Sequence, residues 1–507
     1  GYTAEKTTTT TAGITGTAFP TDYIKTLNAA TSITLGPDKT YTFKEEDALM
    51  SVLGRINYAY ADKYLASVSA RTDGSSKFAK GNRWGWFPSV SLGWRISEEP
   101  FLKKYEWLNS LKLRASWGLT GNNDIANYSF MNKLASANYS FGSNNGTVTA
   151  GLANSTSVIA NRDITWEQSS EYNYGFDLSV LNNRINLSGE YYYSETIQML
   201  YQQTALSFTG FQKYWNNIGK VANKGFEFEL RTLNLKKKDF EWESSFNISL
   251  NKNELLDLAG EVRQINQGER DESYLAEVGS PSIQYYLYKT IGVWNSQEEI
   301  DANPHHPNDK PGGLRVLDDD KNGEITDADR VVCGTPFPDF TWGFTNTFNL
   351  YGFDINILLQ GTHGGKIFNG DINYNETWKF NKKFNNSNNW ISETYKGDGI
   401  TPSTNPNTGL KPVLTDYALE DASFWSVKDI VIGYKFPKSI SKKLGLNGLR
   451  LYASAQNLYV HFASNYRGIN PEARYTSGDY SNPLISGYQR GAFPMERSFN
   501  FGIDINF

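Results

Sequence analysis

Polar and apolar residues alternate along most of this chain with a period of two. From Phe240 to Leu250 the even positions are Phe, Trp, Ser, Phe, Ile and Leu, and the odd positions are Glu, Ser and Asn. A period of two places successive side chains on opposite faces of a β-strand. These segments are about ten residues long, which is enough for a tilted strand to cross a bilayer. The pattern therefore predicts strands with one apolar and one polar face.

Thirteen segments show this alternation. They lie at residues 52–60, 63–72, 84–96, 110–120, 170–181, 184–197, 220–233, 239–252, 339–350, 353–362, 424–436, 448–461 and 495–507. No run of 18 apolar residues is present, so no transmembrane helix is predicted. We predict an all-β fold, a transmembrane antiparallel β-barrel with large extracellular loops.

The connections between these segments orient the strands. Short turns alternate with long polar stretches, and outer-membrane barrels have their short turns on the periplasmic side. The short turns lie at 61–63, 181–183 and 350–352, and the long stretches at 121–169, 253–338, 362–423 and 462–494. With the short turns in the periplasm, the last strand runs inward and Phe507 lies at the periplasmic end.

Successive strands run alternately inward and outward across the membrane, and this alternation assigns each part of the chain to the barrel or to an extracellular segment. Segment 239–252 runs outward and 339–350 runs inward, so residues 253–338, with the apolar stretch Ile283–Trp294, are predicted to form an extracellular insertion. The first strand runs inward, so the Thr-rich residues 1–45 are predicted to be an extracellular loop region, and 46–507 the barrel portion. Because a bacterial barrel has an even strand total, an odd number of strands is expected upstream. The absence of an initiator Met and of a signal peptide also suggests that the chain begins part-way through a longer precursor.

Composition narrows the function. With 49 Lys and Arg against 54 Asp and Glu, the net charge is -5, which gives no electrostatic basis for binding nucleic acid. A single Cys and four His exclude a disulfide framework and Cys-rich metal sites, and they give little support to an outer-membrane enzyme. The 31 Tyr and 13 Trp suit membrane interfaces.

A soluble β-sandwich is the alternative fold, because its strands also alternate. Mid-strand charges such as Lys112, Arg114 and Glu190 favour the barrel, whose wide lumen accommodates them. In the segment 239–252 we predict two faces. Phe240, Trp242, Phe246, Ile248 and Leu250 face lipid, and Glu241, Glu243 and Asn247 face the lumen.

One loop has the ligand spacing of a calcium site. Asp318 and Asp320 occupy positions 1 and 3, Asn322 position 5, and Gly323 position 6, where a sharp turn is needed. The Glu324 carbonyl is at position 7 and Thr326 at position 9, while Asp329 replaces the usual Glu at position 12. We predict one structural Ca²⁺ held by Asp318, Asp320, Asn322, Glu324, Thr326 and Asp329, in a loop with little apolar burial of its own. The alternative is an Asp-rich solvated turn.

Several segments, in order, resemble one family. These are Phe87–Phe101, Leu111–Asn122, Tyr288–Trp294, the Asp-rich loop 318–329, Pro338–Phe344 and Phe353–Gly361, together with the aromatic C-terminal Phe507. They resemble the barrel of SusC/RagA-type TonB-dependent transporters. The resemblance covers residues 52–507 and implies a 22-stranded barrel of the Bacteroidetes outer membrane, of which this chain is a C-terminal part.

The resemblance also implies a function and partners. A nutrient importer of this type draws energy from the TonB complex through an N-terminal part that this chain lacks, and works with a SusD-like surface lipoprotein. It lies in outer-membrane lipid, and a dimer of transporter–lipoprotein pairs is compatible with it. A passive porin is the alternative. Aromatic side chains in the long loops have two alternative roles: they stack on sugar rings, or they form the aromatic girdle at the membrane interface. These aromatics are Trp215, Trp294, Trp378, Trp390 and Tyr488. A glycan is therefore the favoured substrate, and an oligopeptide is the second candidate.

Overall fold

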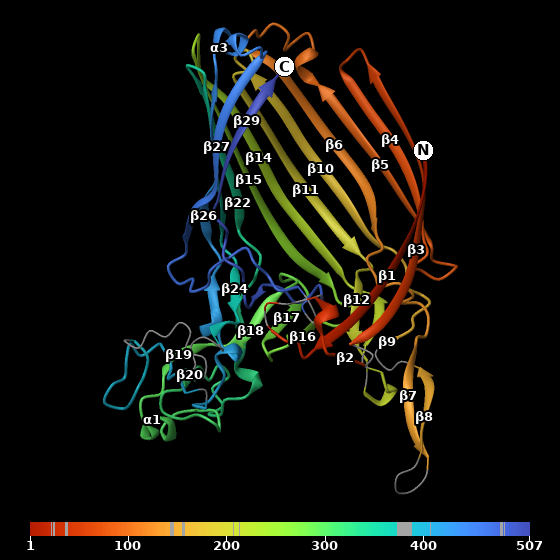
Figure 1. Ribbon diagram of the computed structural model, residues 1–507, viewed down its shortest axis with the longest axis vertical. Coiled ribbons are helices and arrows are strands. Elements are labelled where there is room, and N and C mark those ends of the chain that lie inside the picture. The colour runs from red at the N-terminus through yellow and green to blue at the C-terminus, as the bar shows by residue number, and fades with distance from the viewer. Residues whose placement is uncertain are drawn as a thin grey trace.

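The computed structural model is dominated by one antiparallel β-sheet that curves into a tall, open wall (Figure 1). Its strand order is β2-β1-β3-β4-β5-β6-β10-β11-β14-β15-β22-β23-β26-β27-β29. The structure describes residues 1–21, 23, 26–35, 39–141, 147–154, 158–205, 207–211, 213–372, 388–405, 407–476, 480 and 482–507. Within these residues no pairing joins β1 or β2 to β29, so the two ends of the sheet stay apart.

Apart from the three-residue β2 (Ser32–Thr34), the strands of this sheet are long. They are β1 (Tyr2–Thr17), β3 (Thr40–Tyr60), β4 (Tyr64–Ser75), β5 (Trp84–Arg95), β6 (Leu108–Asn122), β10 (Glu167–Val180), β11 (Ile185–Ile197), β14 (Lys220–Lys237), β15 (Phe240–Asp257), β22 (Phe340–Leu350), β23 (Phe353–His363), β26 (Phe424–Lys435), β27 (Gly448–Phe462) and β29 (Ser498–Asn506). All thirteen predicted strands are confirmed, and β3 begins twelve residues earlier than predicted, at Thr40 instead of residue 52.

The prediction for residues 1–45 is wrong in part. Tyr2–Thr17 forms β1, which pairs with β3 from Tyr2↔Val52 to Ile14↔Thr40. Threonine is β-branched and favours strands. A run of Thr has no alternation of apolar and polar residues, so the period-two pattern does not predict this strand. With β1 the described sheet has fourteen long strands, and the odd strand count on which the upstream estimate depended is also wrong.

The wall has two different ends. At the upper end in Figure 1 the strands join through short turns, and the C-terminus lies there with the short helix α3 (Lys438–Lys443). These turns need left-handed backbone, with φ of 50° at Ala61 and 60° at Asp62. We call this the turn end, and the opposite end, where the long connections gather, the loop end. No helix of the described residues is long and apolar enough to cross a lipid bilayer.

Small sheets and the short helix α1 fold from the described parts of the long connections at the loop end (Figure 1). The stretch Ile283–Trp294 contributes to two of them and not to the wall, as predicted. The elements are β7 (Leu134–Phe141) with β8 (Thr147–Asn154), β9 (Val158–Ile159) with β12 (Leu200–Thr204) and β13 (Lys213–Asn217), β16 (Arg263–Gln267) with β17 (Ser273–Glu277), β18 (Gln284–Tyr288) and β21 (Arg330–Gly334), β19 (Thr290–Val293) with β20 (Leu314–Val316), β24 (Lys366–Asn369) with β25 (Leu419–Asp421) and β28 (Tyr488–Gln489), and α1 (Gln297–Asp301).

Hydrogen bonds that skip a strand show which face of the wall is concave. Arg114 of β6 donates to Glu190 of β11 across β10, with an Nη1–Oε2 distance of 3.1 Å. Arg450 of β27 reaches Asp354 of β23 across β26 at 2.6 Å. Side chains of next-but-one strands converge only on the inside of a curved sheet. The polar face is therefore the concave face.

Candidate functional site

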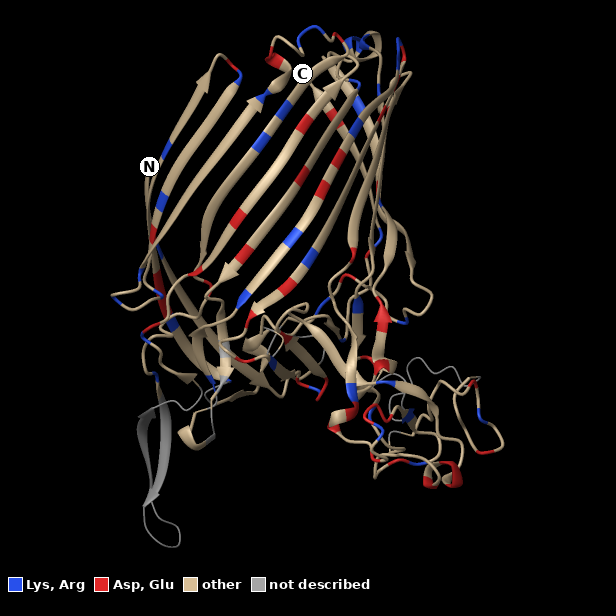
Figure 2. Ribbon diagram, turned by 180° about the vertical axis from the view of Figure 1, so that it is seen from behind, with Lys and Arg blue, Asp and Glu red and all other residues tan. Residues whose placement is uncertain are grey.

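The concave face of the wall is a continuous polar surface. Figure 2 shows Lys, Arg, Asp and Glu along the middle of many of its strands. Arg114 also pairs with Asp177 at 3.3 Å, and Arg450 pairs with Asp504 at 2.8 Å. Charged side chains thus occur at mid-strand in compensating pairs, as expected for a wall that faces water and not hydrocarbon.

The register of β15 agrees with the predicted faces. Phe246 pairs with Phe344 and Ile248 with Trp342 of β22, so apolar positions match across strands. The Tyr192 hydroxyl of β11 donates to Asn251 Oδ1 across β14, which places Asn251 on the concave face. The odd positions of β15 share that face: Glu241, Glu243 and Asn247 are concave, and Phe240, Trp242, Phe246, Ile248 and Leu250 are convex.

The convex face exposes large apolar side chains. Ile56 is 75% exposed, Trp86 67% and Phe501 83%. A contiguous apolar surface of this kind is not stable against water and marks contact with a membrane or another apolar partner. The convex face therefore suits lipid.

A second structure, the loop lobe, comprises the described residues of 258–338, 364–423 and 463–497. Its centre is a cluster of buried aromatic and aliphatic side chains from all three connections. The buried members are Tyr274, Ile283, Tyr285, Leu287, Phe368, Ile372, Val413, Ala418, Tyr480, Ile485 and Tyr488. Connections far apart in the sequence are thus held together by a common core.

Burial changes the interpretation of the loop aromatics. Trp294 and Tyr488 are buried in the lobe, so they are neither sugar-stacking platforms nor girdle residues, and that part of the prediction is wrong. The Trp294 indole donates to Asp309 Oδ2 at 3.0 Å. Trp215 and Trp390 are partly buried. Trp378 lies outside the described residues.

The lobe core encloses a carboxyl group that sequence analysis missed. Glu272 is fully buried and accepts hydrogen bonds from the Tyr480 hydroxyl and the Arg270 amide. Burial raises the pKa of Glu272 above its usual range, and burial together with the bond to Glu272 raises the pKa of Tyr480. This pair joins two connections 208 residues apart, and the local sequence Asp271-Glu272-Ser273 gives no sign of it.

The structure brings three of the predicted calcium ligands together in the loop lobe. Carboxylate oxygens of Asp318, Asp320 and Asp329 all lie within 4.8 Å of one another. The loop turns through left-handed backbone at Lys321 (φ 58°) and Gly323 (φ 92°). The two carboxylate oxygens of Asp318 accept from the Asn322 and Gly323 amides. The spacing thus produces a compact acidic pocket.

Other members of the loop have structural partners. Asp329 is fully buried and accepts from the amides of Asp319 at 2.9 Å and Thr326 at 2.7 Å. The Thr326 hydroxyl caps the 3₁₀ turn Asp327–Asp329 by accepting from Ala328 N. Ile325 is buried against Tyr288, Val316 and Leu410, so the expectation of little apolar burial in this loop is wrong.

The charge of this pocket is not balanced by protein cations. In the described part of the chain, Asp318, Asp320 and Asp329 form no ion pair with Lys or Arg. Three carboxylates this close repel one another, and amide donors offset only part of that repulsion. Hard oxygen donors that converge with excess negative charge match the preference of Ca²⁺.

Comparisons with known proteins agree with this architecture. The family described as TonB dependent receptor-like, beta-barrel, matches residues 2–458. TonB-dependent receptor P3 of Formosa agariphila is 33% identical over 487 residues, which cover 94% of this chain and 47% of that protein. TonB-dependent receptor SusC of Bacteroides thetaiotaomicron is 28% identical over 484 residues, covering 92% of this chain and 44% of that protein.

A solved structure shows the same fold. The RagAB peptide transporter superimposes with a TM-score of 0.77 at 22% identity, and the match covers 100% of this chain and 52% of that chain. The chain spans about half the length of the curated relatives it matches.

Proposed function

The chain belongs to the TonB-dependent receptor β-barrel family, and we propose that it serves the active uptake of large nutrients across the outer membrane. It is an outer-membrane protein of SusC/RagA type, in a family of transporters and receptors and not of enzymes. The observation that carries the proposal is the continuous polar concave face behind an apolar convex face. Such a wall provides a wide aqueous lumen inside a lipid-embedded barrel.

The proposed import depends on two partners. Energy comes from the TonB complex, which acts through a part of the protein outside this chain. A SusD-like surface lipoprotein delivers substrate at the loop end. The loop lobe supports this role, because its shared core gives a partner a fixed surface to dock on. A dimer of transporter–lipoprotein pairs is compatible with this arrangement.

The proposed substrate is a glycan oligosaccharide. The concave face supports this substrate, whereas Trp294 and Tyr488 do not, because they are buried. Hydroxyl side chains from neighbouring strands line one hollow of about 650 Å³ there, among them Ser67, Ser69, Ser89, Ser116 and Thr120. The charged side chains of Arg55, Arg71, Asp73 and Glu171 line the same hollow. Neutral hydroxyls exchange hydrogen bonds with sugar hydroxyls without the cost of desolvating a charge. An oligopeptide is the second candidate, favoured by the mid-strand ion pairs that match charged peptide groups.

A matched pair of variants in the full-length protein tests this function. Ser69 lies on the concave face and bonds Ser89 at 2.6 Å, whereas its neighbour Val68 is on the convex face and 55% exposed. Ser69→Trp should obstruct the lumen and lower uptake of labelled oligosaccharide, while Val68→Trp should leave uptake unchanged. Uptake should also stop when the membrane is de-energised. Uptake that continues without energy would identify a passive porin, and uptake of peptides alone would identify the second substrate.

We also propose that the acidic loop holds one Ca²⁺. Asp318 and Asp320 supply side-chain oxygens, Asn322 a side-chain oxygen, Glu324 its carbonyl, Thr326 a water-bridged position and Asp329 a carboxylate. The ion neutralises the carboxylate cluster and so stabilises the lobe. No transport step is assigned to it.

A further inference from the structure

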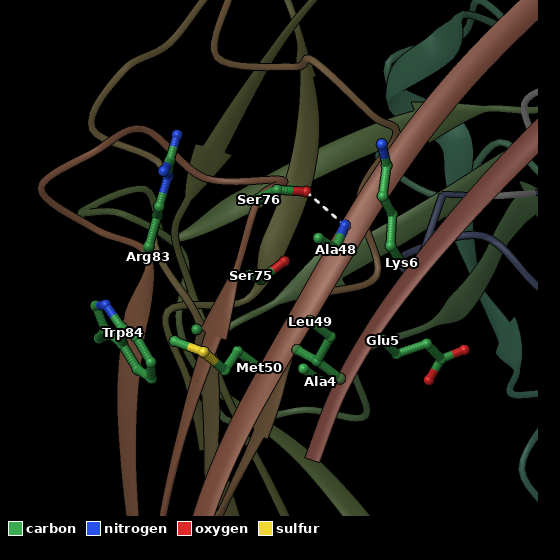
Figure 3. Close-up of a pocket in the computed structure, with 11 residues that line it drawn as sticks. Ala4, Glu5, Lys6, Ala48, Leu49, Met50, Ser75, Ser76, Arg83 and Trp84 are labelled. Atoms are coloured by element: carbon green, nitrogen blue, oxygen red, sulfur yellow. Dashed lines mark hydrogen bonds between the residues drawn. The ribbon is translucent and has the colours of Figure 1, made fainter. Parts of the chain in front are cut away.

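A hollow lies on the wall where β3 extends past β4 toward the loop end (Figure 3). The β3–β4 ladder ends at Leu49↔Ser75, and β3 continues beyond it, paired only with β1. The connection 76–83 turns away at this point, and the Ser76 hydroxyl accepts from the Ala48 amide at 2.8 Å. The space left between β1, β3 and this connection has a volume of about 430 Å³.

The height of this hollow on the wall can be estimated from the strands. At the turn end, Tyr64 stacks on Tyr60 and Trp94, which marks one membrane interface. Gly74, beside the hollow, is ten residues further along β4. At about 3.3 Å per residue and a tilt of about 40°, ten residues rise roughly 25 Å, the height of the apolar band of a barrel. The hollow therefore lies at the opposite interface, level with the lipid headgroups of the outer leaflet.

The floor of the hollow is apolar and faces lipid. Met50 and Trp84 are both exposed on the convex face, at 37% and 48%. Gly74 lies between them in the ladder, and a Cβ there would be 2.9 Å from the Trp84 indole. Glycine thus lets the indole lie flat against β4, which keeps the floor open.

The rim of the hollow is cationic. Lys6 and Arg83 line it (Figure 3), and Lys44 is two positions beyond Glu46 on the same face of β3. Glu46 pairs with both Lys6 at 3.0 Å and Lys44 at 3.2 Å, so one carboxylate serves two ammonium groups. Glu5 also borders the space but extends from the opposite face of β1.

The connection 76–83 adds further positive charge. It contains Lys77, Lys80 and Arg83 and no acidic residue. In the described part of the chain, none of these three cations has an Asp or Glu within ion-pair distance. Of these cations, Lys6 and Arg83 line the hollow itself, together with the carboxylate of Glu5. Lys44, Lys77 and Lys80 belong to the adjoining part of β3 and to the connection 76–83.

We propose that this hollow binds the phosphorylated headgroup of an outer-leaflet glycolipid of the lipid A class. Its acyl chains would lie along Met50 and Trp84, and its phosphate would accept charge-assisted hydrogen bonds from Lys6 and Arg83. A lipid fits better than a soluble anion, because the apolar floor is continuous with the lipid-facing wall. The site is independent of what the protein transports.

The test uses the full-length protein in detergent, with bound lipid counted by native mass spectrometry. Lipid A should bind, and its dephosphorylated form should bind about tenfold more weakly. Lys6→Gln/Arg83→Gln should reduce lipid A binding by about tenfold, whereas the turn-end control Lys103→Gln/Lys104→Gln should not. Trp84→Ala should weaken binding of both lipids, which separates the apolar contact from the ionic one.

Three outcomes would overturn the proposal. Equal binding of the two lipids would remove the role of the phosphate. Unchanged binding by the Lys6→Gln/Arg83→Gln protein, with its heat-resistant barrel migration intact, would place the lipid elsewhere. Displacement of lipid A by millimolar inorganic phosphate alone would show that the rim is a simple anion site.

Discussion

The wall and the loop lobe are stabilised in different ways. In the wall each strand contacts its neighbours through a regular ladder, one face is apolar and the other carries exposed ion pairs. In the lobe the backbone is irregular, and a buried aromatic core with an enclosed carboxyl group holds three connections together. Single side chains should therefore matter much more in the lobe than on either face of the wall.

Truncating the lobe core should give the largest effect. Tyr285 is fully buried, and its hydroxyl lies within donating distance of two carbonyl oxygens, those of Lys366 at 3.1 Å and Gly487 at 3.2 Å. Tyr285→Ala should destabilise the lobe by about 3–5 kcal/mol, through the cavity and the lost bonds. Limited proteolysis should then cut the lobe while the wall stays protected. Trp86→Ala, on the convex face, is the control; equal proteolysis of both variants would contradict the distinction.

Removing the proposed ion should give the next largest effect, again confined to the lobe. At a Ca²⁺ concentration about 100 times the Kd, bound ion adds about 2.7 kcal/mol to stability. Removing Ca²⁺ with a chelator should lower the unfolding temperature of the lobe. Asp320→Asn should abolish this response, because the variant binds Ca²⁺ more weakly. Calorimetric titration with Ca²⁺ should measure the weaker binding directly. Asp319→Asn changes an exposed neighbour outside the carboxylate cluster and should bind normally. Identical titrations of the two variants would reject the site.

The buried Glu272 should give a smaller, pH-dependent effect. Its pKa is raised in the folded lobe, so the folded state binds more protons than the unfolded state above the ordinary carboxyl pKa. Lobe stability should therefore decline as pH rises through and above that value. Glu272→Gln should flatten this dependence in thermal unfolding measured from pH 4 to 8, whereas Glu277→Gln should retain it. A wild-type lobe that becomes more stable over this range would contradict the buried-carboxyl interpretation.

The same contrast explains what the sequence could predict. Strand positions in the wall follow from local alternation, so the faces of β15 could be assigned from residues 239–252 alone. The Thr-rich β1 could not, because its neighbour β3 and not its own pattern makes it a strand. The clustering of Asp318, Asp320 and Asp329 could be predicted because these residues lie close together in the sequence. The Glu272–Tyr480 pair and the burial of Trp294 depend on contacts between distant connections, which no local pattern records.

In the proposed orientation, the polar face of the wall lines an aqueous lumen and the apolar face meets lipid. Spin labels at successive positions of β15 in the full-length protein, reconstituted in bilayers, test it directly. Burial raises the pKa of the native Cys333 thiol to about 11, so it should add little background labelling at neutral pH. Labels at Phe246→Cys and Ile248→Cys should show high accessibility to dissolved oxygen, and those at Asn247→Cys and Ser249→Cys low accessibility. The opposite alternation, or none, would contradict the account.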